Sequence, residues 1–430
     1  MMIMLKRPFI LFFSLLLITF LIYWPFYYNL YKESIENPQE NETKYKGIIT
    51  MVDFPHPTAA DPGGFSWIRE EISRFQRQNP GVVIDLVPLN YRDGYARLES
   101  AVRTGVYPDI APVGGNYWYI SSGALEPLNK YINNKDDYRE DVIEQVSKDG
   151  NIYGIPWAIT SDILYVNRDI ASNYGLNDIK DLNAATFKNL LESIDRANAS
   201  RKKENVYALG GYIDIDDYTL LPFLFNDGKI FNDDGTPDFE EIKEGLRFFA
   251  DLKERELLTR DFGVVDKTKA WDGFLEDNDT VMMPYHLTGI LKLKGKTSGH
   301  YDAVAYPVQS PATKMVIAYS VFKQDDPEKM EAIMMFLDQI TSKNKQERIR
   351  DFNLLPVYKG SEGLYKDDEL MGRVQEIVDN TAYLPKNESM EALDEILKTH
   401  LRQVVLGYEN VDEAAAEIER EYKEYISASS

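Results

Sequence analysis

The sequence has no cysteine, which removes several kinds of chemistry at once. Disulfides, thiolate nucleophiles and zinc sites built on cysteine are excluded, and so is a lipid-modified N-terminal cysteine. Histidine is scarce, with four residues in 430. His56 and His286 could meet in one cleft, but without an i,i+4 pair on a helix they give little support to a metal site. We expect no metal and no cofactor.

Common catalytic motifs are also missing. The patterns G-x-S-x-G, H-E-x-x-H and G-x-G-x-x-G do not occur, and the glycines of GILKLKGKTSG (289–299) have the wrong spacing for a phosphate loop. A hydrolase that uses two carboxylates in a cleft stays open as an alternative, because acidic residues are common. We expect a binding protein and not an enzyme.

Positively charged residues are also few relative to negatively charged ones. The chain has 48 Lys and Arg against 70 Asp and Glu, a formal net charge of −22. Nucleic-acid binding is not expected, because neutralising phosphates requires clustered Lys and Arg. With 44% hydrophobic and 12% aromatic residues, the chain can build a large core. Its length indicates two or three domains, or one two-lobed unit.

The N-terminus carries a long apolar run. It follows Lys6 and Arg7 and extends over residues 8–28, enough to span a bilayer. Tyrosine and tryptophan end the run, as in an interfacial aromatic belt, and no small-residue cleavage site follows. We predict that residues 1–28 form an uncleaved membrane anchor, with a cleaved signal peptide as the alternative. Residues 29–46 are a polar tether, and the basic flank places the rest of the chain on the extracytoplasmic face.

Beyond residue 47, short apolar strands alternate with amphipathic helices, which is typical of a mainly parallel α/β sheet. Ligands of such sheets bind beyond the carboxyl ends of the strands. Those ends carry Asp53 and His56 after the first strand, and Asn116, Tyr117 and Trp118 after the third. The alternatives are a helix N-cap for Asn116 and a core position for Trp118.

Three apolar runs contain polar residues where a buried strand would have none. The first, YGIPWAITSDILYVNRDI (153–170), contains Pro156, which argues against a central strand and for a strand end or a crossover. The second run, TVMMPYHLTG, is likewise apolar and interrupted by Pro284 and His286. The third run is ATKMVIAYSVF (312–322).

The longest motif is DGNIYGIPWAITSDILYVNRDIASNYGL, supported in order by NPGVVIDLV, PDIAPVGG, GALEPLNKYI, DGTPDFEEIKEGLRFFADL and YENVDEAAAEIE. With these segments, residues 47–427 resemble the extracellular solute-binding proteins of ABC importers, in the branch of maltose and other sugar receptors. The resemblance implies an α/β, two-lobed clamshell of the periplasmic-binding-protein type with discontinuous lobes. Lobe 1 would comprise 47–158 and 281–312, and lobe 2 would comprise 159–280 and 313–430.

The resemblance also implies a ligand cleft at the chain crossings. Matched by position, its lining residues are Asp53, His56, Asn116, Tyr117, Trp118, Trp157, Thr160, Ser161, Asp162, Asp216, Asp217, Tyr218, Tyr285 and His286. The sequence departs from the family in two places. The lipid-anchoring cysteine is missing, and the N-terminal span replaces it. The segment EALDEILKTHLRQ lacks the aromatic residue common in sugar receptors, which argues against a long oligosaccharide.

The expected function is a membrane-tethered, monomeric receptor that delivers a small solute to the transmembrane subunits of an ABC permease when its cleft closes. A carbohydrate is favoured, because aromatic faces suit C–H surfaces and planar polar groups suit hydroxyls. A polyamine-type cation is an alternative, since it would use cation–π contacts and carboxylates. A ligand-sensing subunit for a membrane kinase or a chemoreceptor is another.

Overall fold

The computed structural model describes residues 23–24, 43–200, 205–215, 217–226, 229–296, 300–309 and 311–429. The expected N-terminal anchor, apart from Tyr23 and Trp24, lies outside these residues, and so does most of the tether. Within the described ranges, no helix combines the length and apolar character needed to cross a membrane.

A single mixed sheet runs through the molecule in the strand order β2-β1-β3-β10-β6-β8-β7, with β9 beside β6 and β11 beside β10. β1 is parallel to β2 and β3, whereas β10 and β6 are antiparallel. A separate hairpin joins β4 to β5. The strands are β1 Gly47–Asp53, β2 Val82–Pro88, β3 Ile110–Ala111, β4 Ser147–Lys148, β5 Asn151–Ile152, β6 Ile155–Asn167, β7 Tyr207–Leu209, β8 Thr280–His286, β9 Tyr301–Val304, β10 Ala312–Val321 and β11 Ala382–Tyr383.

Helices cover the sheet, and their apolar spacing explains where they pack. In α2, for example, Ile68, Ile72 and Phe75 recur on one buried face, as the sequence predicts. The α-helices are α2 Ser66–Gln78, α3 Gly94–Thr104, α4 Tyr117–Ser121, α5 Glu140–Gln145, α6 Arg168–Asn173, α7 Ala184–Ser200, α8 Leu221–Leu224, α9 Phe239–Glu254, α10 Lys267–Glu276, α11 Gly289–Lys296, α12 Pro327–Thr341, α13 Glu369–Asp379, α14 Met390–Leu406 and α15 Val411–Ser429. Three 3-10 helices complete the described elements: η1 Lys135–Asp137, η2 Ile179–Asp181 and η3 Lys343–Phe352.

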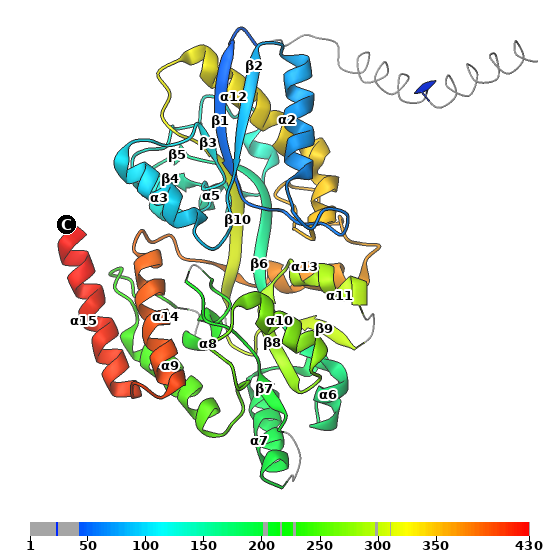
Figure 1. Cartoon of the computed structure of the whole chain (residues 1–430), viewed down its shortest axis with the longest axis vertical. Coiled ribbons are helices and arrows are strands. Elements are labelled where there is room, and N and C mark those ends of the chain that lie inside the picture. The colour runs from blue at the N-terminus through cyan, green and yellow to red at the C-terminus, as the bar shows by residue number, and fades with distance from the viewer. Residues whose placement is uncertain are drawn as a thin grey trace, which may run out of the picture.

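The molecule has two lobes (Figure 1). The first lobe contains β1, β2 and β3 with α2, α3 and α12, and its core includes Ile49, Trp67 and Phe336. The second lobe contains β7, β8 and β9 with α7, α9, α14 and α15, and its core includes Leu209 and Leu397. The long strands β6 and β10 run from one lobe into the other (Figure 1). The expected two-lobed α/β architecture is therefore present.

The packing groups some segments differently from the lobe boundaries expected from the sequence. β8 and β9 pair with the Asp162–Asn167 half of β6, next to β7, although residues 281–312 were expected in lobe 1. α12 packs against α2 and shares the core of β1, although residues 313–430 were expected in lobe 2. The expected bounds came from the resemblance. The apolar face of a helix indicates that the helix packs, but it does not indicate which part of the sheet it packs against.

Pro156 lies in the second position of a continuous thirteen-residue strand, β6. The neighbouring strand β10 shifts its register between Ile317 and Ala318, and Ala318 is the partner of Pro156. Proline is tolerated at strand starts and bulges, because no ladder hydrogen bond from its nitrogen is needed there. β6 is therefore a crossing strand that also occupies the middle of the sheet.

Candidate functional site

Asp162, His286 and Asp217 form a hydrogen-bonded chain beside the strand pair β6–β8. Asp162 and His286 are cross-strand partners, and Nδ1 of His286 lies 2.5 Å from Oδ1 of Asp162. Nε2 of the same ring lies 2.8 Å from Oδ2 of Asp217. That carboxylate also accepts hydrogen bonds from the hydroxyls of Tyr212 and Thr219. Both acids are buried, whereas the histidine side chain is 26% exposed, so the ring is the accessible member of the cluster.

His286 carries a positive charge at neutral pH. Burial lowers its pKa, but the carboxylates of Asp217 and Asp162 outweigh burial and raise the pKa to about 10. Burial opposes the ionisation of Asp217, yet the imidazolium and Lys398 bring the pKa of this acid below its usual range. At Asp162 burial wins and raises the pKa. The second oxygen of Asp162, Oδ2, is buried and has no hydrogen-bond partner among the described atoms.

Lys398, on α14, binds the loop that contains Asp217. Its ammonium group lies 2.8 Å from Oδ1 of Asp394, one turn earlier on the helix, and both side chains are buried. It donates hydrogen bonds to the backbone carbonyls of Asp214 and Asp217. Sequence reasoning missed this pair. The available signal was an acid and a lysine at i,i+4 on the apolar face of EALDEILKTH.

Asp53, His56 and Trp157 lie together in the first lobe. Trp157 stacks on Trp67, with ring centroids 4.8 Å apart and an interplanar angle of 4°. The ring of His56 packs edge-to-face against Trp157, with centroids 4.6 Å apart. Nε2 of His56 is 3.5 Å from Oδ1 of Asp53, and Tyr319 donates a hydrogen bond to the other oxygen of that acid. Trp157 is 3% exposed, so in this conformation its ring is a core side chain.

Asn116 precedes the short helix α4, and Trp118 lies in it. The Asn116 side chain accepts hydrogen bonds from the backbone amides of Trp118 and Tyr119, which makes it the helix N-cap. Trp118 is half-buried, and the guanidinium group of Arg103 lies 5.3 Å from its ring centroid. The N-cap alternative for Asn116 is therefore confirmed, whereas Trp118 is not a buried core residue but packs against the first-lobe core from its edge.

The remaining expected residues have separate partners. Ser161 donates a hydrogen bond to the Thr313 hydroxyl, and half-buried Thr160 pairs with Met315 in the sheet. Tyr285 stacks on Trp271 with centroids 4.4 Å apart, and the Lys398 ammonium lies 5.8 Å from the ring of Tyr218. Asp216 lies outside the described residues.

The structure separates the two histidines that could have shared a metal. His56 belongs to the tryptophan cluster of the first lobe, and His286 belongs to the acid cluster beside β8. In the described part of the chain, no group of three or more His, Asp or Glu side chains has an arrangement that could hold a metal ion.

A cavity of about 450 Å³ lies between the lobes, within the size range of small-molecule sites. Tyr117 and Lys148 line it from the first lobe. From the second lobe it is lined by Asp234, Gly235, Thr236, Lys386, Asn387, Glu388, Ser389, Tyr422 and Ile426. Of the residues expected from the sequence, Tyr117 alone is in this lining. The other lining residues were not predicted, because they come from the strand β4, a turn, the loop between β11 and α14 and the end of α15, which have no local motif.

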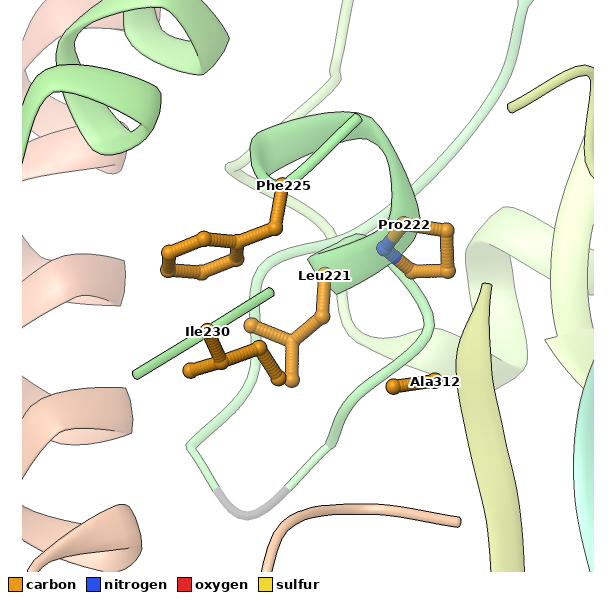
Figure 2. A pocket seen from close by; sticks show the side chains of 5 residues that line it. All are labelled: Leu221, Pro222, Phe225, Ile230 and Ala312. Atoms are coloured by element: carbon orange, nitrogen blue, oxygen red, sulfur yellow. The ribbon is translucent and has the colours of Figure 1, made fainter. Parts of the chain in front are cut away.

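A second recess lies in the core of the second lobe, between α8 and the start of β10 (Figure 2). Its lining side chains are apolar, and it has no room for a water molecule. Its residues are Leu221, Pro222, Phe225, Ile230 and Ala312. This recess is a packing feature and not a ligand site.

Residues 71–372 match the model of the bacterial extracellular solute-binding protein family. The match covers more than half of the chain, and the protein belongs to this family. Membership implies an extracytoplasmic location, and the family consists of binding proteins.

Relatives support the same assignment, and a solved structure shows the same fold. A binding protein of Brucella abortus (strain 2308) is 24% identical over 173 residues, which are 39% of this chain and 41% of the relative. The chain thus aligns with less than half of that relative. YcjN of Escherichia coli K12, named as an ABC transporter periplasmic-binding protein, is 22% identical over 363 residues, or 79% of this chain and 80% of the relative. The maltose/maltodextrin-binding domain MalE from Bdellovibrio bacteriovorus, bound to maltotriose, has a TM-score of 0.71 at 16% identity and covers 89% of this chain and 100% of that chain. This likeness shows the two-lobed fold.

Proposed function

We propose that the protein captures a small carbohydrate outside the cell and delivers it to an ABC permease. The observation that carries this proposal is the 450 Å³ cavity between the lobes of a chain from the solute-binding family. Two likenesses add support: the MalE domain of the same fold holds maltotriose, and YcjN is named for an ABC transporter. The N-terminal residues 8–28 would hold the receptor at the membrane, and we expect it to work as a monomer.

The cavity offers the groups that a sugar needs. The half-buried ring of Tyr117 can cover a C–H face, while Thr236, Asn387 and Ser389 supply hydroxyl and amide groups for sugar hydroxyls. A buried polar group left without its partner costs about 1–3 kcal/mol, so such a lining selects ligands whose hydroxyls match. Polyamines lack these hydroxyls.

The chain crossings suit a closing motion. A ligand that touches both lobes favours the closed form in proportion to its extra affinity for that form. β6 and β10 connect the lobes, and rotation about a few residues of such segments leaves both cores intact. Following the strand pairings and the core packing, we assign β1–β3 and α12 to one lobe, and β7–β9, α14 and α15 to the other. In this division His286 and its two acids belong to the second lobe.

A thermal-shift screen with the full chain tests this function. Neutral and acidic oligosaccharides form one panel, and putrescine, spermidine and spermine form the other. A ligand at 100 times its dissociation constant should stabilise the fold by about 2.7 kcal/mol. Stabilisation by polyamines alone would overturn the carbohydrate assignment, and turnover of any saccharide would overturn the assignment as a receptor.

A further inference from the structure

The interlobe cavity contains two ammonium groups that come from opposite lobes. Lys148 belongs to β4 in the first lobe, and Lys386 lies between β11 and α14, next to the second lobe. Both line the same cavity as Tyr117, and the Lys148 ammonium lies 5.4 Å from the centroid of that ring. A bound molecule of moderate size can therefore meet two positive charges and an aromatic face together.

Neither ammonium group has its hydrogen-bonding capacity filled. Nζ of Lys148 donates to Oγ of Ser121 at 2.9 Å, and Nζ of Lys386 donates to the backbone carbonyl of Glu144 at 2.9 Å. Among the described residues, each lysine makes this single hydrogen bond. An ammonium group has three donors, so each retains two for a ligand.

The acids around the cavity compete weakly for these lysines. Oε2 of Glu388 lies 4.0 Å from Lys148, and Oε1 of Glu144 lies 3.6 Å from Lys386, both beyond hydrogen-bond distance. These carboxylates are 63% and 70% exposed, and exposed ion pairs contribute little because water screens them. Asp234 faces its own turn, where its Oδ1 accepts hydrogen bonds from the backbone amide and the hydroxyl of Thr236.

We propose that the ligand is an acidic saccharide, a sugar that carries a carboxylate, bound with that carboxylate between Lys148 and Lys386. This inference rests on the proposed function. A carboxylate that contacts both lysines also bridges the lobes, so its binding favours closure. The whole chain has a net charge of −22 and repels anions, so affinity for an acidic ligand must come from local cations such as these.

The test uses matched pairs of probes on the full chain. Trigalacturonate is compared with the corresponding neutral galactotriose, and a mannuronate trisaccharide with mannotriose, by titration calorimetry. We expect at least one acidic probe to bind about tenfold or more tightly than its neutral partner, since charge-assisted hydrogen bonds are the stronger ones. Neutral sugars that bind as tightly as their acidic partners would overturn the acidic class and leave the carbohydrate receptor standing. No binding by any saccharide would overturn both proposals.

A double variant, Lys148→Gln with Lys386→Gln, links the preference to the two lysines. It should lose about tenfold or more in affinity for the acidic probe while binding the neutral sugar as the wild type does. Lys292→Gln on α11, which removes an exposed lysine paired with Asp272, is the control and should change neither affinity. Melting temperatures show that the variants are folded. Unchanged affinity of the double variant for the acidic probe would overturn the assignment of these two residues.

Discussion

Replacing His286 by glutamine should remove a pH dependence from the stability of the fold. The imidazolium lies between the buried acids Asp162 and Asp217, at 2.5 and 2.8 Å. Glutamine keeps a polar side chain at this position but cannot carry the positive charge. Removing one partner of a buried ionic cluster costs about 3–5 kcal/mol, because the remaining charge is left uncompensated. We expect a loss of that size near pH 6.5.

The pH profile follows from the raised pKa of His286. The folded protein binds the proton more tightly than the unfolded chain, since the pKa rises from 6.5 to about 10. The stabilisation is therefore complete below pH 6.5 and is lost as the pH rises toward 10, with a ceiling of about 5 kcal/mol. Between pH 6.5 and 9, below the titration of tyrosine, about 3 kcal/mol should disappear. Asp217 behaves in the opposite sense, because its lowered pKa gives stability that is lost as the pH falls below its usual value.

Urea denaturation followed by tryptophan fluorescence at several pH values from 6.5 to 9 measures this difference. The wild type should lose about 3 kcal/mol over this range, whereas the His286→Gln variant should stay nearly flat. His300→Gln is the matched control, because His300 also contacts an acid, Asp169, but both side chains are more than half exposed. It should keep the wild-type slope. A His286→Gln variant that loses as much stability as the wild type would refute the assignment of the charge to this ring.

Two further substitutions test packing near the cleft. Trp157→Ala should lower the free energy of unfolding by about 3–5 kcal/mol in chemical denaturation, because the ring is 3% exposed and stacks on Trp67. If the variant instead kept its stability and lost affinity for the sugar, Trp157 would be a ligand contact. Gly115→Ala should abolish or severely reduce the yield of folded protein, because the new Cβ would lie 1.9 Å from the carbonyl oxygen of Val316. Gly363→Ala is the control and should be tolerated, because no atom lies within 4 Å of its new Cβ. Equal melting temperatures of the Gly115→Ala and Gly363→Ala variants would contradict the predicted clash at Gly115.

The sequence predicted three interrupted strands because their signals are local. Two of them, β6 and β10, cross between the lobes, whereas β8 lies in the second lobe. Prolines and polar residues interrupt three apolar runs, and these runs became the neighbouring strands β10, β6 and β8. Their pairings were beyond reach, since Ser161 meets Thr313 across 152 positions and Asp162 meets His286 across 124. Some of the polar side chains that suggested a ligand site at these strands therefore bond one strand to its neighbour.

The candidate site was predicted less well for a related reason. Matching by position selected residues at strand ends, and several of these are occupied by structural roles, as Asn116 is by capping α4. The cavity is lined instead by a turn, a loop and the last turns of α15, which approach α4 and β4 only in the folded chain. No periodicity or spacing connects Lys148 with Lys386, because 238 positions separate two residues that tertiary packing brings to one cavity.

The distribution of polar contacts suits a receptor that opens and closes. The acid–histidine cluster and the Lys398–Asp394 pair lie within the second lobe, where burial makes breaking them costly. Several contacts between the lobes are more exposed, and one of them is the hydrogen bond from Lys386 to the carbonyl oxygen of Glu144 on α5. The ammonium of Lys267 on α10 lies 5.4 Å from the ring centroid of Tyr91, which is 46% exposed, and Lys148 reaches Glu388 at 4.0 Å. Exposed contacts of this type contribute at most about 1 kcal/mol each, so the proposed opening would break weak interactions and leave both cores whole. A ligand that replaces them with desolvated contacts on both sides would then supply the difference in free energy that closes the cleft.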